Sequence, residues 1–131
     1  MFNFERLEVW KKSIDFADFI YRVTRAFPDE ERFGITSQMR RAAVSVSSNI
    51  AEGSGRFSKN DYGRFIEIAT GSLFEVVSQA FIARRQNLLS DLDFQSIYTT
   101  AEEQGRMLSG LRKSLVGSPS TINSKNSQPQ K

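Results

Sequence analysis

Residues 38–53 read Gln-Met-Arg-Arg-Ala-Ala-Val-Ser-Val-Ser-Ser-Asn-Ile-Ala-Glu-Gly, a run without proline that carries apolar side chains at regular intervals. The apolar set begins slightly upstream and consists of Ile35, Met39, Ala42, Val46 and Ile50. Spacings of three and four residues place such side chains on one face of an α-helix. We therefore predict a helix here, with Gly53 and Gly55 as its C-terminal capping residues.

The chain before this run predicts another helix, from about Glu8 to Phe27. Its apolar residues keep the helical spacing and are Leu7, Trp10, Ile14, Ala17 and Tyr21. Pro28 follows directly. We expect it to end the helix, because the residue before a proline is forced out of helical geometry.

The chain after the run predicts two further helices. Ser58 and Asp61 form a start similar to a capping box, and the helix that follows is expected to end near Asn87. Its apolar residues are Tyr62, Phe65, Ile66, Ala69, Leu73, Val76, Ala80 and Ala83. A second start signal lies at Ser90 and Asp93. The apolar residues of this last helix are Phe94, Ile97, Ala101, Leu108, Leu111 and Leu115.

Four helices with short connections predict an all-α fold, an antiparallel up-down four-helix bundle. The 131 residues suit one compact domain, and we assign residues 1–116 to the bundle. Residues 117–131 are almost entirely polar, so they bury too little apolar surface to offset the entropy of ordering. We expect them to form a disordered polar tail.

The composition argues against catalysis. The chain has no cysteine and no histidine, which excludes disulfides, thiolate nucleophiles and the usual zinc ligands. Its carboxylates are scattered along the helices, and a carboxylate di-metal bundle would normally need histidines beside them. We therefore expect no enzymatic activity, no catalytic residues, no metal and no cofactor.

The first predicted helix has two apolar faces. The second face lies roughly opposite the first and is formed by Val9, Phe16, Phe19, Ile20, Val23 and Phe27. A helix in a monomeric bundle needs one apolar face, so the second predicts a subunit interface in a homo-oligomer. The alternative is that both faces are buried within the same chain.

The charge is unevenly distributed. The formal net charge is +3, yet residues 32–64 hold six basic residues against Glu52 and Asp61. We select as candidate nucleic-acid-binding residues Arg40, Arg41, Arg56, Lys59 and Arg64. Two alternatives remain open: Arg41 and Glu52 join an internal or inter-subunit charge network, and Arg56, Lys59 and Arg64 only solvate the surface.

Several of these segments together resemble the bacterial 23S rRNA intervening-sequence proteins. The segments are residues 7–10 (Leu-Glu-Val-Trp), 27–31 (Phe-Pro-Asp-Glu-Glu), 38–53, 55–56 (Gly-Arg) and 68–75 (Ile-Ala-Thr-Gly-Ser-Leu-Phe-Glu). The resemblance runs from about Phe4 to Leu115. It implies a four-helix bundle that assembles into a ring, expected to be a pentamer, without known catalytic activity. A related branch serves as accessory subunits of reverse transcriptases in diversity-generating retroelements and binds protein and RNA.

Together, these observations predict a cytoplasmic, ring-forming bundle that binds RNA or DNA, or a nucleic-acid-processing protein, through a basic surface. No signal peptide is indicated. No uncharged apolar stretch approaches the roughly 20 residues of a membrane span, so no membrane association is expected. The alternative function is a protein-interaction scaffold, for example an accessory subunit of a reverse transcriptase, that makes no direct contact with nucleic acid.

Overall fold

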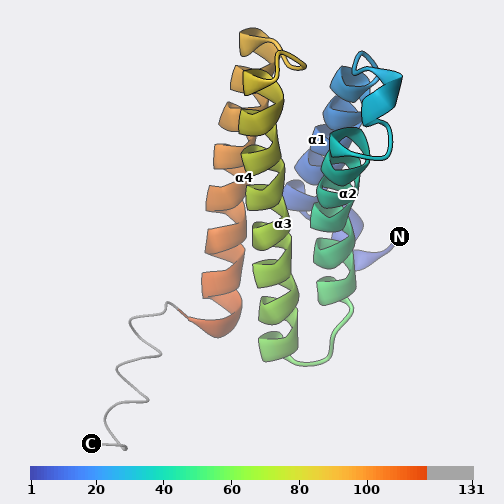
Figure 1. Cartoon of the computed structure of the whole chain (residues 1–131). Helices are drawn as coiled ribbons and strands as arrows, with labels where there is room; N and C mark the ends of the chain where they lie inside the picture. Colours follow the sequence, from blue (N-terminus) through green and yellow to red (C-terminus); the bar gives the residue numbers. More distant parts are fainter. Residues whose placement is uncertain (118–131) are drawn as a thin grey trace, which may run out of the picture.

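The computed structural model describes residues 1–117 and contains four long helices: α1 (Glu8–Thr24), α2 (Ile35–Ser54), α3 (Lys59–Arg85) and α4 (Asp91–Val116) (Figure 1). Two short 3-10 helices, η1 (Asn3–Arg6) and η2 (Asp29–Glu31), precede α1 and α2. The predicted all-α bundle is confirmed. The predicted tail falls, apart from Gly117, outside the described residues.

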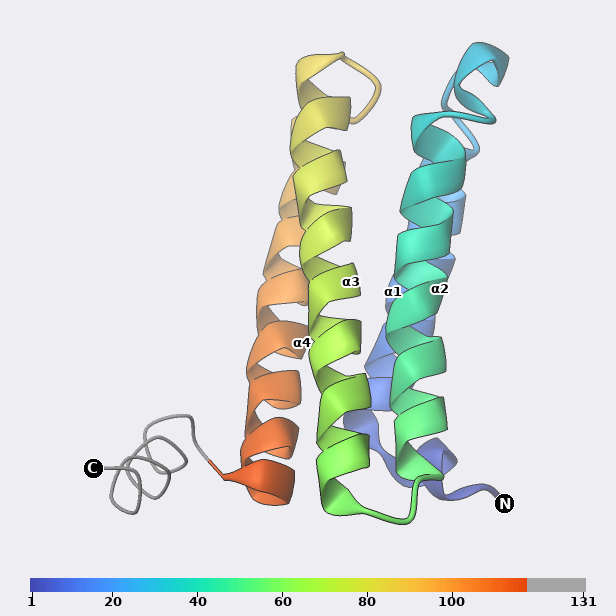
Figure 2. The ribbon, with the colours of Figure 1, turned by 60° about the horizontal axis from the view of Figure 1, so that its bottom comes forward.

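Successive helices run in opposite directions and pack side by side around a common axis (Figures 1 and 2). Each helix contacts the next along the chain, and α1 closes the bundle against α4. The α1–α2 and α3–α4 connections therefore lie at one end of the bundle, and the α2–α3 connection lies at the other (Figure 1).

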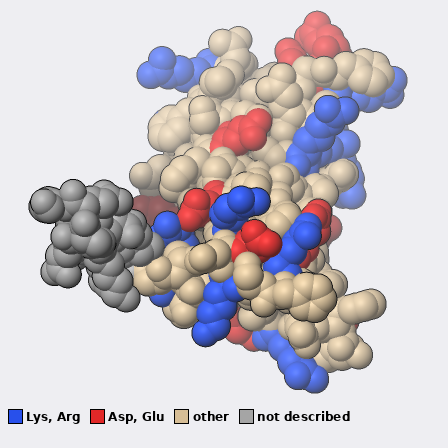
Figure 3. All heavy atoms as spheres, turned by 90° about the horizontal axis from the view of Figure 1, so that it is seen from below, with Lys and Arg blue, Asp and Glu red and all other residues tan. Residues whose placement is uncertain are grey.

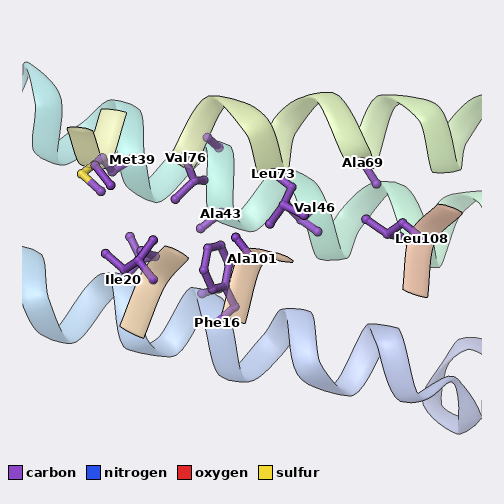
Figure 4. Close-up of a cluster of buried hydrophobic side chains, with 14 of the residues drawn as sticks. Phe16, Ile20, Met39, Ala43, Val46, Ala69, Leu73, Val76, Ala101 and Leu108 are labelled. Carbon is purple, nitrogen blue, oxygen red and sulfur yellow. The ribbon is translucent and has the colours of Figure 1, made fainter. Parts of the chain in front are cut away.

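The core is formed by the apolar stripes of all four helices (Figure 4). Its largest fully buried apolar side chains are Phe16, Ile20, Met39, Ile50, Ile66, Leu73, Ile97 and Leu108. Burying one such side chain stabilises a fold by about 1.5–3 kcal/mol. The stripes predicted for the last three helices therefore hold the bundle together.

The two predicted serine starts are confirmed. Ser58 Oγ accepts a hydrogen bond of 3.0 Å from the backbone N–H of Asp61 at the start of α3. Ser90 Oγ does the same for Asp93 at 3.1 Å at the start of α4. Each bond satisfies an amide that the first helical turn leaves without an internal partner.

The role predicted for Gly53 is wrong. Gly53 lies inside α2 rather than beyond its end, and the C-cap residue Gly55 has a φ of −92°, which needs no glycine. A Cβ on Gly53 would stand 2.8 Å from Cβ of Phe65 and 3.0 Å from Cδ1 of Tyr62. The glycine is therefore required by the close approach of α2 and α3.

The subunit interface predicted on the first helix also needs correction. Of the six residues, Val9, Phe16, Ile20 and Phe27 are buried within the chain's own core, whereas Phe19 and Val23 are half-buried. They have little surface left for a second copy, because α2 and α4 cover this face of α1. The opposite stripe is the more exposed one, with Ile14 at 41% and Tyr21 at 37%.

Helix α3 is unusually apolar. Within the described residues it is the one helix long and apolar enough to cross a membrane, judged by length and composition alone. Only 33% of its most apolar window is buried in the bundle, so apolar side chains of α3 also lie on the outer surface.

Candidate nucleic-acid and protein interfaces

The five candidate nucleic-acid-binding residues do not form one patch. Arg40 and Arg41 lie in the first half of α2, whereas Arg56, Lys59 and Arg64 lie around the α2–α3 connection. At about 1.5 Å per helical residue, Arg40 and Arg56 are separated by roughly 24 Å along the bundle. The structure thus divides the predicted site between the two ends of α2.

The basic residues around the α2–α3 connection are largely offset by nearby acids. Arg56 pairs with Glu52 at 3.5 Å, and Arg64 lies 4.0 Å from Asp61. Figure 3 shows this end of the bundle, where basic and acidic side chains are interspersed. Within the described residues of the single chain, Glu52 therefore pairs with Arg56, and no internal ion pair joins Glu52 to Arg41.

The first half of α2 presents a different environment, a surface depression that we call the α2 hollow. Its lining residues are Tyr21, Arg32, Phe33, Thr36, Ser37, Arg40, Arg41, Val44, Ser45 and Ser48. Its volume is about 690 Å³. Among the described residues that line it, three are arginines and none is a carboxylate. The potential inside the hollow therefore favours an anion.

Arg40 is the fixed member of this group. Its Nε donates a hydrogen bond of 2.9 Å to Thr24 Oγ1 on α1, and its guanidinium lies 4.7 Å from the ring centroid of Tyr21. Arg32 and Arg41 are exposed. The hollow thus combines one arginine anchored by α1 with two that extend into solvent.

A second surface, missed from the sequence, lies between α3 and α4. This α3–α4 groove has a volume of about 690 Å³ and is lined by Leu73, Phe74, Val77, Ser78, Phe81, Tyr98, Ala101, Glu102, Gly105, Arg106 and Ser109. Phe74 is 63% exposed at its rim. The residues Ala101, Gly105 and Ser109 follow one another at intervals of four on α4, so small residues line the α4 side of the groove.

The outer face of α3 also exposes apolar side chains. Ile68 and Ile82 are 51% and 53% exposed. Apolar residues off the core stripe were visible in the sequence at Ile68, Phe74, Phe81 and Ile82. They were the available signal for this surface, because contiguous exposed apolar patches mark interaction sites.

Asn49 lies at the edge of the apolar stripe of α2, and its side-chain amide forms hydrogen bonds within the helix. Its Nδ2 donates to the backbone oxygen and to Oγ of Ser45, at 2.8 and 3.0 Å. Ser45 Oγ in turn lies 2.8 Å from Ser72 Oγ on α3. This small network fixes α2 against α3.

The titration and metal-binding features of the described residues are sparse. Burial raises the pKa of the Tyr62 phenol above its ordinary value of 10.0. Within residues 1–117, no group of three or more acidic residues lies close enough together to hold a metal ion.

These features define a small antiparallel four-helix-bundle protein whose two distinctive surfaces are a basic hollow and an apolar groove. The chain belongs to the 23S rRNA-intervening sequence protein family, whose sequence profile matches residues 5–110. The family resemblance drawn from the sequence is confirmed.

A solved structure has the same fold. It is the crystal structure of a protein of unknown function from the S23 ribosomal protein family of Bacteroides thetaiotaomicron VPI-5482, with a TM-score of 0.72 and 23% sequence identity. The similarity covers 80% of this chain and 98% of that one. Comparison with curated proteins gives no match.

Proposed function

We propose that this chain is a self-assembling, cytoplasmic helical bundle without catalytic activity that binds RNA through the basic residues of α2. One observation carries the RNA-binding part: the α2 hollow is lined by Arg32, Arg40 and Arg41 and, among the described residues, by no carboxylate. Arginines contact phosphate oxygens with paired N–H groups. The family description, which refers to intervening sequences of 23S rRNA, supports the choice of RNA.

The assembly part rests on the α3–α4 groove and the outer face of α3 rather than on α1. Phe74, Ile68 and Ile82 are each more than half exposed. Covering these apolar side chains with a second copy removes apolar surface from water, which stabilises the assembly. A ring, with five copies as the family resemblance implies, would repeat the basic hollow around its circumference and strengthen binding to a polyanion.

The experiment combines light scattering with RNA binding by the full chain. We expect an oligomer at micromolar concentration and an affinity for structured RNA that falls steeply as salt is raised. A monomer would contradict the assembly part. Failure to bind RNA even at low salt would contradict the RNA-binding part.

A second candidate function, a protein-interaction scaffold, is favoured by the apolar α3–α4 groove. In that case the groove, rather than the hollow, holds the partner, such as the reverse transcriptase implied by the related branch of the family. A variant of the groove, Gly105→Leu, would then abolish partner binding. The arginines of the hollow would be dispensable.

A further inference from the structure

The α2 hollow includes the start of α2, and this helix begins without a side-chain cap. Its N-cap residue is Gly34, which has no side chain to accept a hydrogen bond from the first turn. The first amides of a helix lack partners within the helix, and its dipole favours negative charge there. This terminus therefore offers unpaired donors to an anion.

Thr36 provides a second and independent indication of a ligand. It lines the hollow, its side chain is only 5% exposed, and its Oγ1 has no hydrogen-bond partner within the described residues. Buried hydroxyls in folded proteins are nearly always hydrogen-bonded. This oxygen is buried, so rotation of the Thr36 side chain toward the hollow would let it donate the missing hydrogen bond to an anionic oxygen bound there.

The arginines supply the positive charge. Arg40 uses one N–H on Thr24 Oγ1 and one on the backbone oxygen of Tyr21 at 3.4 Å. Of the five N–H groups of a guanidinium, three remain available to a ligand. Two carboxylates lie nearby. Oε1 of Glu31 is 3.1 Å from the position of a Cβ on Gly34, and Asp29 lines an adjoining depression together with Arg32, Thr36 and Arg40. They offset part of the three positive charges of the hollow.

Phe33 adds an aromatic surface beside these donors. Its side chain is 88% exposed, it lines the hollow, and the Arg32 guanidinium lies 5.1 Å from its ring centroid. Proteins that bind single-stranded nucleic acid combine basic side chains with aromatic rings on which unpaired bases stack.

We propose that the α2 hollow binds single-stranded nucleic acid, with one phosphate at the start of α2 and a neighbouring base stacked on Phe33. The inference rests on the proposed RNA-binding function and names the strand type and the residues. A single strand, or an unpaired loop of a structured RNA, suits this site better than a duplex, because the bases of a duplex are already stacked on one another and cannot stack on Phe33. The volume of about 690 Å³ lies within the range of about 300–1,000 Å³ common for ligand sites.

The test uses the full chain and a fluorescent single-stranded oligouridylate, with fluorescence anisotropy as the readout. We expect Phe33→Ala to weaken binding about tenfold, as for the loss of one stacked base. The matched control is Phe57→Ala in the α2–α3 connection, because Phe57 is even more solvent-exposed than Phe33 but lies outside the hollow. This control should leave the affinity unchanged.

The phosphate contact has its own pair of variants. Thr36→Val keeps the shape of the side chain and removes the hydroxyl, and we expect binding to weaken by about tenfold or more, as for the loss of one hydrogen bond to a charged group. Thr36→Ser should retain most of the affinity. Circular dichroism and melting temperature establish that each variant is folded.

The outcomes separate this site from the proposed function. If the chain binds RNA but Phe33→Ala behaves like Phe57→Ala, the site is wrong and RNA binding stands. The site is also wrong if a duplex of equal length binds more tightly than the single strand and ignores the Phe33 substitution. If the wild-type chain binds no strand at low salt, both proposals fail.

Discussion

Arg40 Nε donates a hydrogen bond of 2.9 Å to Thr24 Oγ1, which joins the first half of α2 to the end of α1. Thr24 is buried, and its hydroxyl also donates to the backbone oxygen of Ile20 at 2.7 Å. The neighbouring Arg41 is exposed and has no ion-pair partner within the described residues. Two adjacent arginines thus have different roles, one fixed in the structure and one free in solvent.

This difference predicts different effects of the two alanine substitutions. Arg40→Ala should lower the free energy of unfolding by about 1–2 kcal/mol, because it removes a hydrogen bond and a cation–π contact. Arg41→Ala should change it by less than about 0.5 kcal/mol. Urea denaturation of both variants checks this. Equal stability of the two variants would contradict the role assigned to Arg40.

Gly53→Ala should destabilise the bundle by about 1–3 kcal/mol, because its Cβ would stand 2.8 Å from Cβ of Phe65. The matched control is Gly71→Ala on the exposed face of α3, where nothing lies within 4 Å of the added Cβ. This control should stabilise by about 0.5–1 kcal/mol, since alanine favours a helix interior. Thermal denaturation distinguishes the two variants. If Gly53→Ala left the melting temperature unchanged, α2 and α3 could move apart at this point without loss of stability, which would contradict the role assigned to Gly53.

Phe74→Glu should disrupt assembly without unfolding the bundle. Phe74 is 63% exposed in the single chain, so the substitution costs little in the monomer but places a charge in the apolar α3–α4 groove. Leu92→Glu is the control, because Leu92 is 78% exposed and does not line the groove. Light scattering should report a smaller particle for Phe74→Glu alone, and an unchanged particle would exclude this groove as the subunit interface.

The raised pKa of Tyr62 predicts a specific loss of stability at alkaline pH. Burial favours the neutral phenol in the folded state, so its pKa lies above the ordinary value of 10.0. The stabilisation is fully present below pH 10.0 and is lost as pH rises through the folded-state pKa. Above that pH, the free energy of unfolding of the wild type should therefore fall relative to that of Tyr62→Phe, which has no phenol to ionise. A difference that does not change with pH would contradict this assignment.

The sequence predicts the helices well and their outer faces less well. Serine starts and apolar stripes are local features, so Ser58, Ser90 and the last three stripes could be recognised in advance. Both faces of α1 carry apolar side chains at helical spacing, and packing against α2 and α4 determines that Phe16 and Ile20 enter the core. The function of Gly53 could not be predicted for the same reason, because it depends on the position of Phe65 on another helix.

The candidate site likewise combines features that the sequence predicts with features that depend on the fold. The basic residues were visible in the sequence, but their separation into two ends and the pairing of Arg56 with Glu52 required the fold. The α2 hollow brings Tyr21 of α1 together with Phe33 and Arg40. Residues so far apart along the chain are related only by the packing of α1 against α2.

The most direct test of RNA binding through the α2 hollow is the salt dependence of RNA affinity in two matched double variants. Arg32→Ala/Arg41→Ala removes two exposed arginines of the hollow, and Lys59→Ala/Arg64→Ala removes two basic residues at the other end of the bundle. The first should reduce the slope of log affinity against log salt by about two, and the second should leave it nearly unchanged. Equal slopes for both variants, or a loss confined to the second, would contradict the account.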